Sequence, residues 1–352
     1  MSYAVAMTIP QPLHDLDAVL AQAAAWRAEG RGVALATVVR TWGSSPRPPG
    51  SKLAVDEGGA FVGSVSGGCI EAAVIHDALE VMAAGASRTL SFGISDETAW
   101  EVGLACGGKV EVFVEAVAPE RGRGLSREIL DELIAARREP RAAVLATWLD
   151  GSAHMLLAAD PALAPAELAP AVGQAVARDR GVVVEAPPTA VFVEPHLPPL
   201  RLIIVGAVHI AQPLAEMAAL AGFAVTIVDP RRAFATEARF PGRTLVAAWP
   251  DEALTRLSPD ARTAIVTLTH DPKLDEPALI AALASPAFYV GCLGSPKTHA
   301  ARQARMSERG VGADALARLH GPVGLRIGAR SPAEIAVSIL AEIVSTLRGG
   351  AP

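Results

Sequence analysis

The sequence predicts an α/β protein of two domains, a mixed α/β N-terminal domain over residues 1–196 and a C-terminal Rossmann-like, doubly wound parallel sheet over residues 197–352. The length of 352 residues suits two domains of about 150 residues better than one. A proline cluster over residues 195–199 marks the boundary, because prolines stiffen linkers and cannot continue a sheet. Beyond this cluster a buried strand, a helix and a second strand follow one another, which is the start of a parallel sheet.

Hydrophobic periodicity predicts the elements of the N-terminal half in chain order. They are a helix at residues 15–28, a strand at 33–40, a hairpin through 57–59, a helix with an apolar stripe from 70 to 82, a strand at 109–115, a helix at 125–138 and a strand at 143–148. We expect Gly85 to end the second helix, since glycine is the usual left-handed residue after a helix. The Ala- and Pro-rich stretch from Asp160 to Arg180 predicts no defined element.

The C-terminal half has a regular pattern. A strand at residues 201–206, a helix at 209–221 and a strand at 224–229 form one βαβ unit. Further strands are expected at residues 264–269 and 288–293. The last helix opens with Ser331-Pro332-Ala333-Glu334, a capping box with proline at the first helical position.

Composition excludes several classes of protein. The net charge is −6 and no Lys/Arg-rich run could follow a phosphate backbone, which argues against a nucleic-acid partner. No apolar stretch approaches the roughly 20 residues of a membrane span. The N-terminus lacks the features of a secretory signal, so we expect a cytoplasmic protein. The three cysteines are widely spaced and form no CxxC pair, which argues against a structural zinc site or a disulfide framework.

The first turn of the C-terminal half departs from a dinucleotide fingerprint. Its three positions are Gly206, Val208 and Ala211, and the valine fills space that a pyrophosphate needs. Asp229, roughly 20 residues further on, suits a ribose hydroxyl. This pattern argues against NAD(P) and leaves open a Rossmann scaffold that binds no dinucleotide.

Polar residues follow the strands of the same half, where doubly wound sheets bind their ligands. The candidate binding residues are Gly206, His209, Asp229, His270, Gly294 and Ser295, with Cys292 and Lys297 close by. The alternative is that these are ordinary polar loop residues.

A glycine-rich turn in the N-terminal half is the sharper candidate. Ser66 is expected to cap the helix that Gly67-Gly68-Cys69 begins, which would leave free amides for an anion. The helix dipole would lower the pKa of the Cys69 thiol and make it a soft ligand or sulfur carrier. A plain glycine-rich turn with a packed thiol is the alternative.

A second stretch, residues 103–111, repeats the pattern of residues 63–71 with its own Gly-Gly pair and thiol. The two turns could therefore face one ligand, with two nearby cations available for a phosphate. The candidate binding residues of this half are Arg47, Lys52, Ser66, Gly67, Gly68, Cys69, Glu71, Cys106, Gly107 and Gly108. Arg47 and Lys52 could instead be solvated surface residues.

These motifs resemble the xanthine dehydrogenase accessory (XdhC/CoxI) family. The N-terminal resemblance rests on Ala36-Thr37-Val38-Val39, Gly43-Ser44-Ser45-Pro46-Arg47 and Gly63-Ser64-Val65-Ser66-Gly67-Gly68-Cys69-Ile70-Glu71. The C-terminal resemblance rests on residues 206–211, 289–295, 322–328 and 332–339. Only the middle, about residues 119–187, carries no such motif. Val208 departs from the glycine that is usual in the family's Gly-Ala-Gly-His turn.

The resemblance implies a molybdenum-cofactor chaperone rather than an enzyme. Members of the family hold the matured molybdopterin cofactor, support its sulfuration by a cysteine desulfurase, and pass it to a xanthine dehydrogenase-type apoenzyme. We hypothesise that the cofactor binds between the two domains, with Cys69 as a contact to molybdenum or sulfur. A nucleotide tail on the cofactor and a homodimer are left open. The competing hypothesis is an NAD(P)-dependent oxidoreductase that uses the C-terminal domain.

Overall fold

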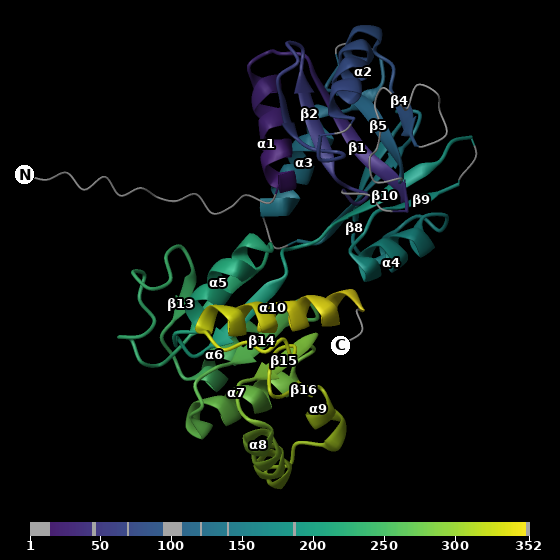
Figure 1. Ribbon diagram of the computed structural model, residues 1–352. Helices are drawn as coiled ribbons and strands as arrows, with labels where there is room; N and C mark the ends of the chain where they lie inside the picture. Colours follow the sequence, from purple (N-terminus) through teal and green to yellow (C-terminus); the bar gives the residue numbers. More distant parts are fainter. Residues whose placement is uncertain are drawn as a thin grey trace, which may run out of the picture. The chain divides into compact units, whose positions relative to one another are not determined.

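The computed structural model describes residues 15–43, 47–68, 70–93, 108–119, 122–138, 141–185 and 188–349. The chain forms two compact units, of which the first ends at Pro198 and the second begins at Pro199. Figure 1 shows the two units, with the first from purple to teal and the second from teal to yellow. Each unit has its own sheets and its own core, so each is described separately.

The first sheet of the N-terminal unit has the strand order β3-β2-β1-β5-β4, and β6 pairs with β5. Neighbouring strands along this order are antiparallel, whereas β6 is parallel to β5. The strands are β1 (Val33–Trp42), β2 (Lys52–Asp56), β3 (Phe61–Gly63), β4 (Arg88–Phe92), β5 (Lys109–Val117) and β6 (Gly124–Leu125). The predicted strands at 33–40 and 109–115 and the hairpin through 57–59 are confirmed.

Helices cover both faces of this sheet because its strands alternate apolar side chains to either side. On one face the residues Ala34, Ala36 and Val38 pack against Val74 and Ala78 of the second helix. The other face packs against the first and third helices. These helices are α1 (Asp15–Ala28), α2 (Glu71–Ala84) and α3 (Arg127–Arg138). Gly85 follows α2 with φ of +63°, as expected.

A second sheet of the same unit has the antiparallel order β8-β7-β10-β9. Its strands are β7 (Ala143–Trp148), β8 (His154–Ala158), β9 (Val182–Val184) and β10 (Val191–His196). The Ala- and Pro-rich stretch, which predicted no element, forms a 3₁₀ turn (Pro161–Leu163) and helix α4 (Ala169–Arg178). Val172 and Ala175 of α4 are buried against this sheet, and this packing is what gives the stretch its structure.

Pro195 and His196 were expected in the linker, but they lie in β10. They pair with Val144 and Ala143 of β7, whereas β9 pairs only with residues 191–193 of β10 in the described part of the chain. An unpaired strand edge tolerates proline because no ladder hydrogen bond is lost there. The general rule that proline cannot continue a sheet therefore fails at this position.

The C-terminal unit contains one parallel sheet with the order β13-β12-β11-β14-β15-β16. This is the doubly wound order of a Rossmann fold, and it confirms the predicted fold class. The strands are β11 (Arg201–Val205), β12 (Ala224–Val228), β13 (Thr244–Val246), β14 (Thr263–Thr267), β15 (Tyr289–Cys292) and β16 (Leu319–His320). The switch in strand order falls between β11 and β14.

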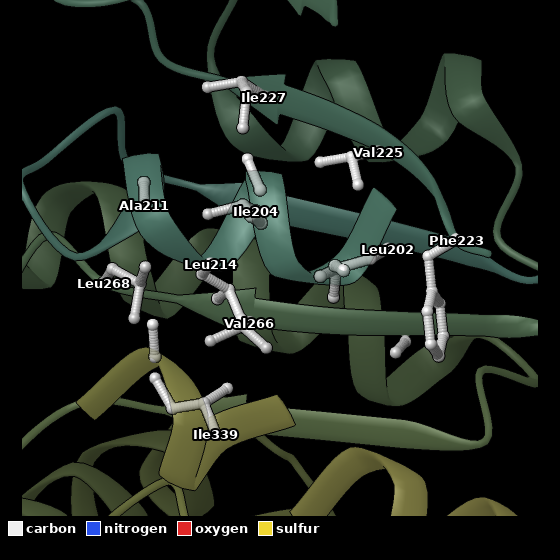
Figure 2. Close-up of a cluster of buried hydrophobic side chains, with 14 of the residues drawn as sticks. Leu202, Ile204, Ala211, Leu214, Phe223, Val225, Ile227, Val266, Leu268 and Ile339 are labelled. Atoms are coloured by element: carbon white, nitrogen blue, oxygen red, sulfur yellow. The ribbon is translucent and has the colours of Figure 1, made fainter. Parts of the chain in front are cut away.

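The helices of this unit are α5 (Ala211–Leu220), α6 (Pro250–Leu257), α7 (Pro272–Ala284), α8 (Pro296–Glu308), α9 (Ala313–Ala317) and α10 (Pro332–Arg348). Leu214 of α5 and Ile339 of α10 pack on one face of the sheet against Ile204 and Val266, as Figure 2 shows. Helices α6 and α7 bury their apolar faces on the opposite side. The predicted capping box at the start of α10 is present, with Ser331 accepting from the amide of Glu334.

Candidate functional site

The turn before α2 is organised around the carboxylate of Glu71. Its Oε1 accepts hydrogen bonds from the amide of Ser66 (2.9 Å), the amide of Gly67 (3.1 Å) and the hydroxyl of Ser64 (2.7 Å). Its Oε2 accepts from the amide of Gly68 (2.8 Å) and the hydroxyl of Ser66. Burial would raise the pKa of Glu71, but the hydrogen bonds from the two serines and the turn amides outweigh it and lower the pKa to about 2.

The expected free anion site at Ser66, Gly67 and Gly68 is therefore wrong as stated. The amides do converge on one place, but the chain's own carboxylate already occupies it. Nor does Ser66 cap the helix, because α2 begins at Glu71 and its N-cap is Ile70, which makes no side-chain cap. The Ser66 hydroxyl accepts instead from the amide of Ile70 at 3.1 Å. A glutamate in the first helical turn, three positions after a Gly-Gly pair, is the sequence signal that reveals this arrangement.

Arg47 lies beside the same turn. Its Nε donates to the carbonyl oxygen of Ser64 at 3.2 Å, so this cation braces the backbone that Glu71 also holds. Gly108 is buried directly before β5. The other predicted residues of the two glycine-rich turns lie outside the described residues, and they are Cys69, Cys106 and Gly107.

Lys52 was expected to contact a phosphate or else to lie on the surface, and both expectations are wrong. The residue is only 4% exposed. Its Nζ donates to Glu194 Oε2 at 2.8 Å and to Thr37 Oγ1 at 3.0 Å, which joins β2, β10 and β1. Burial would raise the pKa of Glu194, but Lys52 and then His196 lower it to about 2. The ammonium therefore stabilises a buried carboxylate and cannot reach a ligand in solvent.

In the C-terminal unit, the turn after β11 needs glycine at its first position. Gly206 has φ of +106°, and a Cβ there would lie 2.5 Å from Cγ2 of Thr269. Val208, at the second position of the fingerprint, is half-buried and packs against the core under α5 and α10. The turn thus keeps the first glycine of a dinucleotide site and replaces the second with a packed side chain.

Asp229, at the end of β12, was expected to suit a ribose hydroxyl, and the structure contradicts this role. The carboxylate is fully buried. Oδ1 accepts from the amide (2.9 Å) and Nε (2.9 Å) of Arg231, and Oδ2 accepts from the amide of Ala207 (2.9 Å) and Nη2 of Arg231 (2.7 Å). Burial would raise the pKa of Asp229, but the Arg231 side chain and the two amides hold it below its usual value. All four acceptor positions of the carboxylate are in use.

The loop after β12 closes over the same turn. Nη1 of Arg239 donates to the carbonyl oxygens of Ala207 (2.8 Å) and Phe234 (2.6 Å). The guanidinium of Arg231 lies 4.3 Å from the ring centre of Phe234. Neither arginine was a predicted site residue, although Asp229-Pro230-Arg231-Arg232 directly after a strand is a visible signal.

The remaining predicted residues of this unit are His209, His270, Gly294 and Ser295. His209 and His270 are exposed, and His270 adopts φ of +60°. Ser295 caps α8, because its Oγ accepts from the amide of Thr298 at 3.1 Å. Gly294 precedes it and is half-buried. The role of Ser295 visible in the structure is therefore a helix cap.

Cys292 belongs to a buried polar network. Its Sγ accepts from Nη1 of Arg302 at 2.9 Å and lies 3.7 Å from Nδ1 of His299. Nη2 of Arg302 lies 3.8 Å from Asp275. Burial raises the pKa of the Cys292 thiol to about 11, and Arg302 offsets only part of that effect. This thiol is fully buried and stays protonated near neutral pH, so it is a poor nucleophile.

Two negative findings apply to the residues that the structure describes. Among them, no group of three or more His, Cys, Asp or Glu side chains could hold a metal ion. Across the same ranges, no helix is both long and apolar enough to cross a bilayer.

Comparison with known proteins shows which family the chain resembles. The profile of the XdhC Rossmann domain matches residues 202–343, and that of the XdhC and CoxI family matches residues 26–93. The chain is therefore similar to the XdhC and CoxI family in both of its halves. The resemblance found in the glycine-rich motifs is thereby confirmed for both halves of the chain.

Relatives match over most of this chain. The molybdenum cofactor insertion chaperone PaoD of Escherichia coli K12 is 29% identical, over 90% of this chain and 84% of the relative. A probable xanthine dehydrogenase subunit of Bacillus subtilis 168 is also 29% identical, over 89% of this chain and 92% of that protein. A crystal structure described as a xanthine dehydrogenase from Bacillus halodurans has a TM-score of 0.71 and covers 94% of this chain and 96% of its own. At 23% identity, this last match supports the fold alone.

Proposed function

We propose that this protein is a chaperone for the molybdenum cofactor. It would bind the pterin cofactor and support its insertion into a xanthine dehydrogenase-type molybdoenzyme, without catalysing a reaction of its own. The observation that carries the proposal is the similarity to PaoD, whose name states this role, over 90% of the present chain. Because that similarity includes both units, it extends beyond the Rossmann scaffold, which occurs in many unrelated proteins.

The turn at residues 64–68 is the part of the N-terminal unit best suited to such cargo. Glu71 holds its backbone in one arrangement, and Arg47 contacts it from a neighbouring loop. Cys69 follows directly in the sequence and would be the soft contact for molybdenum or for the sulfur delivered by a cysteine desulfurase. In this proposal Glu71 positions the turn, and the thiol of Cys69, which follows the turn, contacts the cofactor.

The test is the cofactor content of protein purified from a host that makes the cofactor. We expect an oxidisable fluorescent pterin and molybdenum in the wild-type protein. Cys69→Ala should lower both by roughly tenfold, the scale on which contacts around a metal affect its retention. Cys292→Ser is the matched control, since it alters a buried thiol of the other unit and should leave cofactor content unchanged. A folded wild-type protein with neither pterin nor molybdenum would overturn the proposal.

The contacts of Asp229 weigh against the competing oxidoreductase. A nicotinamide dinucleotide is usually held by an acidic residue at the end of the second strand, and here that residue has no acceptor position left. Calorimetric titration with NAD(H) and NADP(H) checks this point. Micromolar binding of either to the wild-type protein would favour the enzyme instead.

A further inference from the structure

We propose that the N-terminal unit binds a small heterocycle in a pocket at the carboxyl ends of α1 and α2. The heterocycle carries an amino group beside a ring N–H, as guanine and pterins do, and Glu57 accepts hydrogen bonds from both. The pocket is separate from the turn at residues 64–68, because the 14 residues of α2 lie between them and span about 20 Å. This inference goes beyond the proposed function, and either can fail without the other.

The pocket has a volume of about 550 Å³, which is within the usual range for small-molecule sites. The last turns of α1 and α2, the start of β1, the end of β5 and the hairpin between β2 and β3 line it. Four glycines add no side chains to its walls and leave the space open; they are Gly30, Gly32, Gly85 and Gly122. The apolar lining, which suits the faces of a ring, consists of Val33, Met82, Ala116, Val117 and Pro119.

Arg27 and Glu57 lie on either side of one peptide group in this pocket. Nη1 of Arg27 donates to the carbonyl oxygen of Arg31. The amide of the next residue, Gly32, donates to Oε2 of Glu57 at 2.7 Å. The carbonyl and the amide of a trans peptide point in opposite directions, so the guanidinium and the carboxylate are held apart by this peptide. Both side chains line the pocket, and a ligand there can contact the two together.

The pocket offers more acceptors than donors. A carboxylate has about four acceptor positions, and within the described chain Glu57 uses one of them, on the amide of Gly32. The last carbonyl groups of a helix have no partner within the helix, and Ala83 and Ala84 at the end of α2 line the pocket. The carboxyl ends of α1 and α2 also carry partial negative charge. A ligand that fits this pocket therefore presents N–H donors.

The contacts of Arg27 limit what else the ligand can carry. Its Nη1 and Nη2 donate to the carbonyl oxygens of Arg31 and Ala118, and its buried Nε has no partner among the described residues. Ala118 holds its carbonyl with φ of +45°, a strained conformation for alanine of the kind that clusters at binding sites. Because both ends of the guanidinium are committed, it lacks the free fork that binds a carboxylate or a phosphate. It suits a single neutral acceptor, such as a ring carbonyl.

These features together fit a 2-amino-4-oxopyrimidine ring. The amino group and the adjacent ring N–H of this ring are parallel donors that match a carboxylate, here that of Glu57. The carbonyl oxygen next to them is the neutral acceptor that Arg27 suits. Guanine and pterins share this ring, so a guanine nucleotide and a free pterin are the two sources of such a ligand.

The experiment is calorimetric titration of the full-length protein with guanosine, inosine, pterin and lumazine. Inosine lacks the 2-amino group of guanosine, and lumazine has oxygen in place of the 2-amino group of pterin. We expect guanosine or pterin to bind at least about tenfold more tightly than its analogue, because the analogue loses a charged hydrogen bond. Tighter binding of guanosine identifies a nucleotide as the source, and tighter binding of pterin identifies a pterin. The proposal is wrong if neither binds, or if each binds only as well as its analogue.

Variants test the role of Glu57. Glu57→Gln should weaken the binding of guanosine or pterin by about tenfold, because an amide group replaces one acceptor oxygen with a donor. The remaining oxygen can still accept from the amide of Gly32, so the melting temperature should not change. Glu29→Gln is the control of equal charge, since Glu29 pairs with Arg31 at 2.9 Å and lies outside the described lining of the pocket. Wild-type affinity in Glu57→Gln, or the same loss in Glu29→Gln, would refute the assignment of this carboxylate and of the site.

Discussion

The two units each contain a glycine turn that contacts an internal carboxylate, but the groups that hold the carboxylate differ. Residues 64–68 in the N-terminal unit and the turn at Gly206 in the C-terminal unit both join a strand to a helix, and amides of both meet an internal carboxylate. Glu71 is held by amides and serine hydroxyls, whereas Asp229 is also held by a guanidinium. In the first turn the amides are occupied by Glu71, so an external anion can bind them only if Glu71 moves. In the second turn the guanidinium of Arg231 offers positive charge to an anion.

Removing the carboxylate from the first turn should have the largest effect. Glu71→Ala leaves the amides and serine hydroxyls of the turn without their acceptor. We therefore expect a loss of about 3 kcal/mol in the free energy of unfolding. Urea unfolding measures this loss. Inorganic phosphate should restore part of it, because the emptied amides can then bind an external anion.

Glu80→Ala is the matched control, since Glu80 is a half-exposed residue of the same helix that pairs with Arg88 at the surface. Its removal should cost less than about 1 kcal/mol. Equal losses of stability in Glu71→Ala and Glu80→Ala would contradict the role assigned to Glu71 in holding the first turn.

Lowering the pH should reduce the contribution of Glu71 to the stability of the folded chain. The pKa of Glu71 falls from its ordinary value of 4.5 to about 2 in the folded chain, so its stabilising contribution is complete above about pH 4.5 and declines as pH falls toward about 2. The difference in unfolding free energy between the wild type and Glu71→Gln should therefore shrink over this interval. Thermal unfolding at a series of pH values checks the trend, and a constant difference would show that Glu71 is not the titrating group.

The smallest effect is expected at Val208. Val208→Gly should cost about 1 kcal/mol in stability, since glycine is more flexible and loses a half-buried side chain. It should also allow measurable NAD binding by opening the second fingerprint position. Absence of any gain in NAD binding would mean that the occupied Asp229, rather than Val208, excludes the dinucleotide.

Local sequence patterns predicted most of the fold. The alternation of apolar residues located β1 and β5, and the capping box located the start of α10, because each signal lies within a few neighbouring residues. Helix α4 was missed, since its Ala- and Pro-rich segment gains its structure from packing on the second sheet. Pro195 was assigned to the linker because nothing local shows that one edge of β10 lacks a partner.

The sequence by itself determined the two glycine turns, the thiol after the first, and the family resemblance that unites the two halves. Only the tertiary structure decided which groups those turns hold. Glu194 lies in a different sheet from Lys52, and Asp229 reaches the turn amide from the next strand. Periodicity and glycine placement are local properties of the chain. The partner of a buried charge is set by distant segments that meet only in the folded protein.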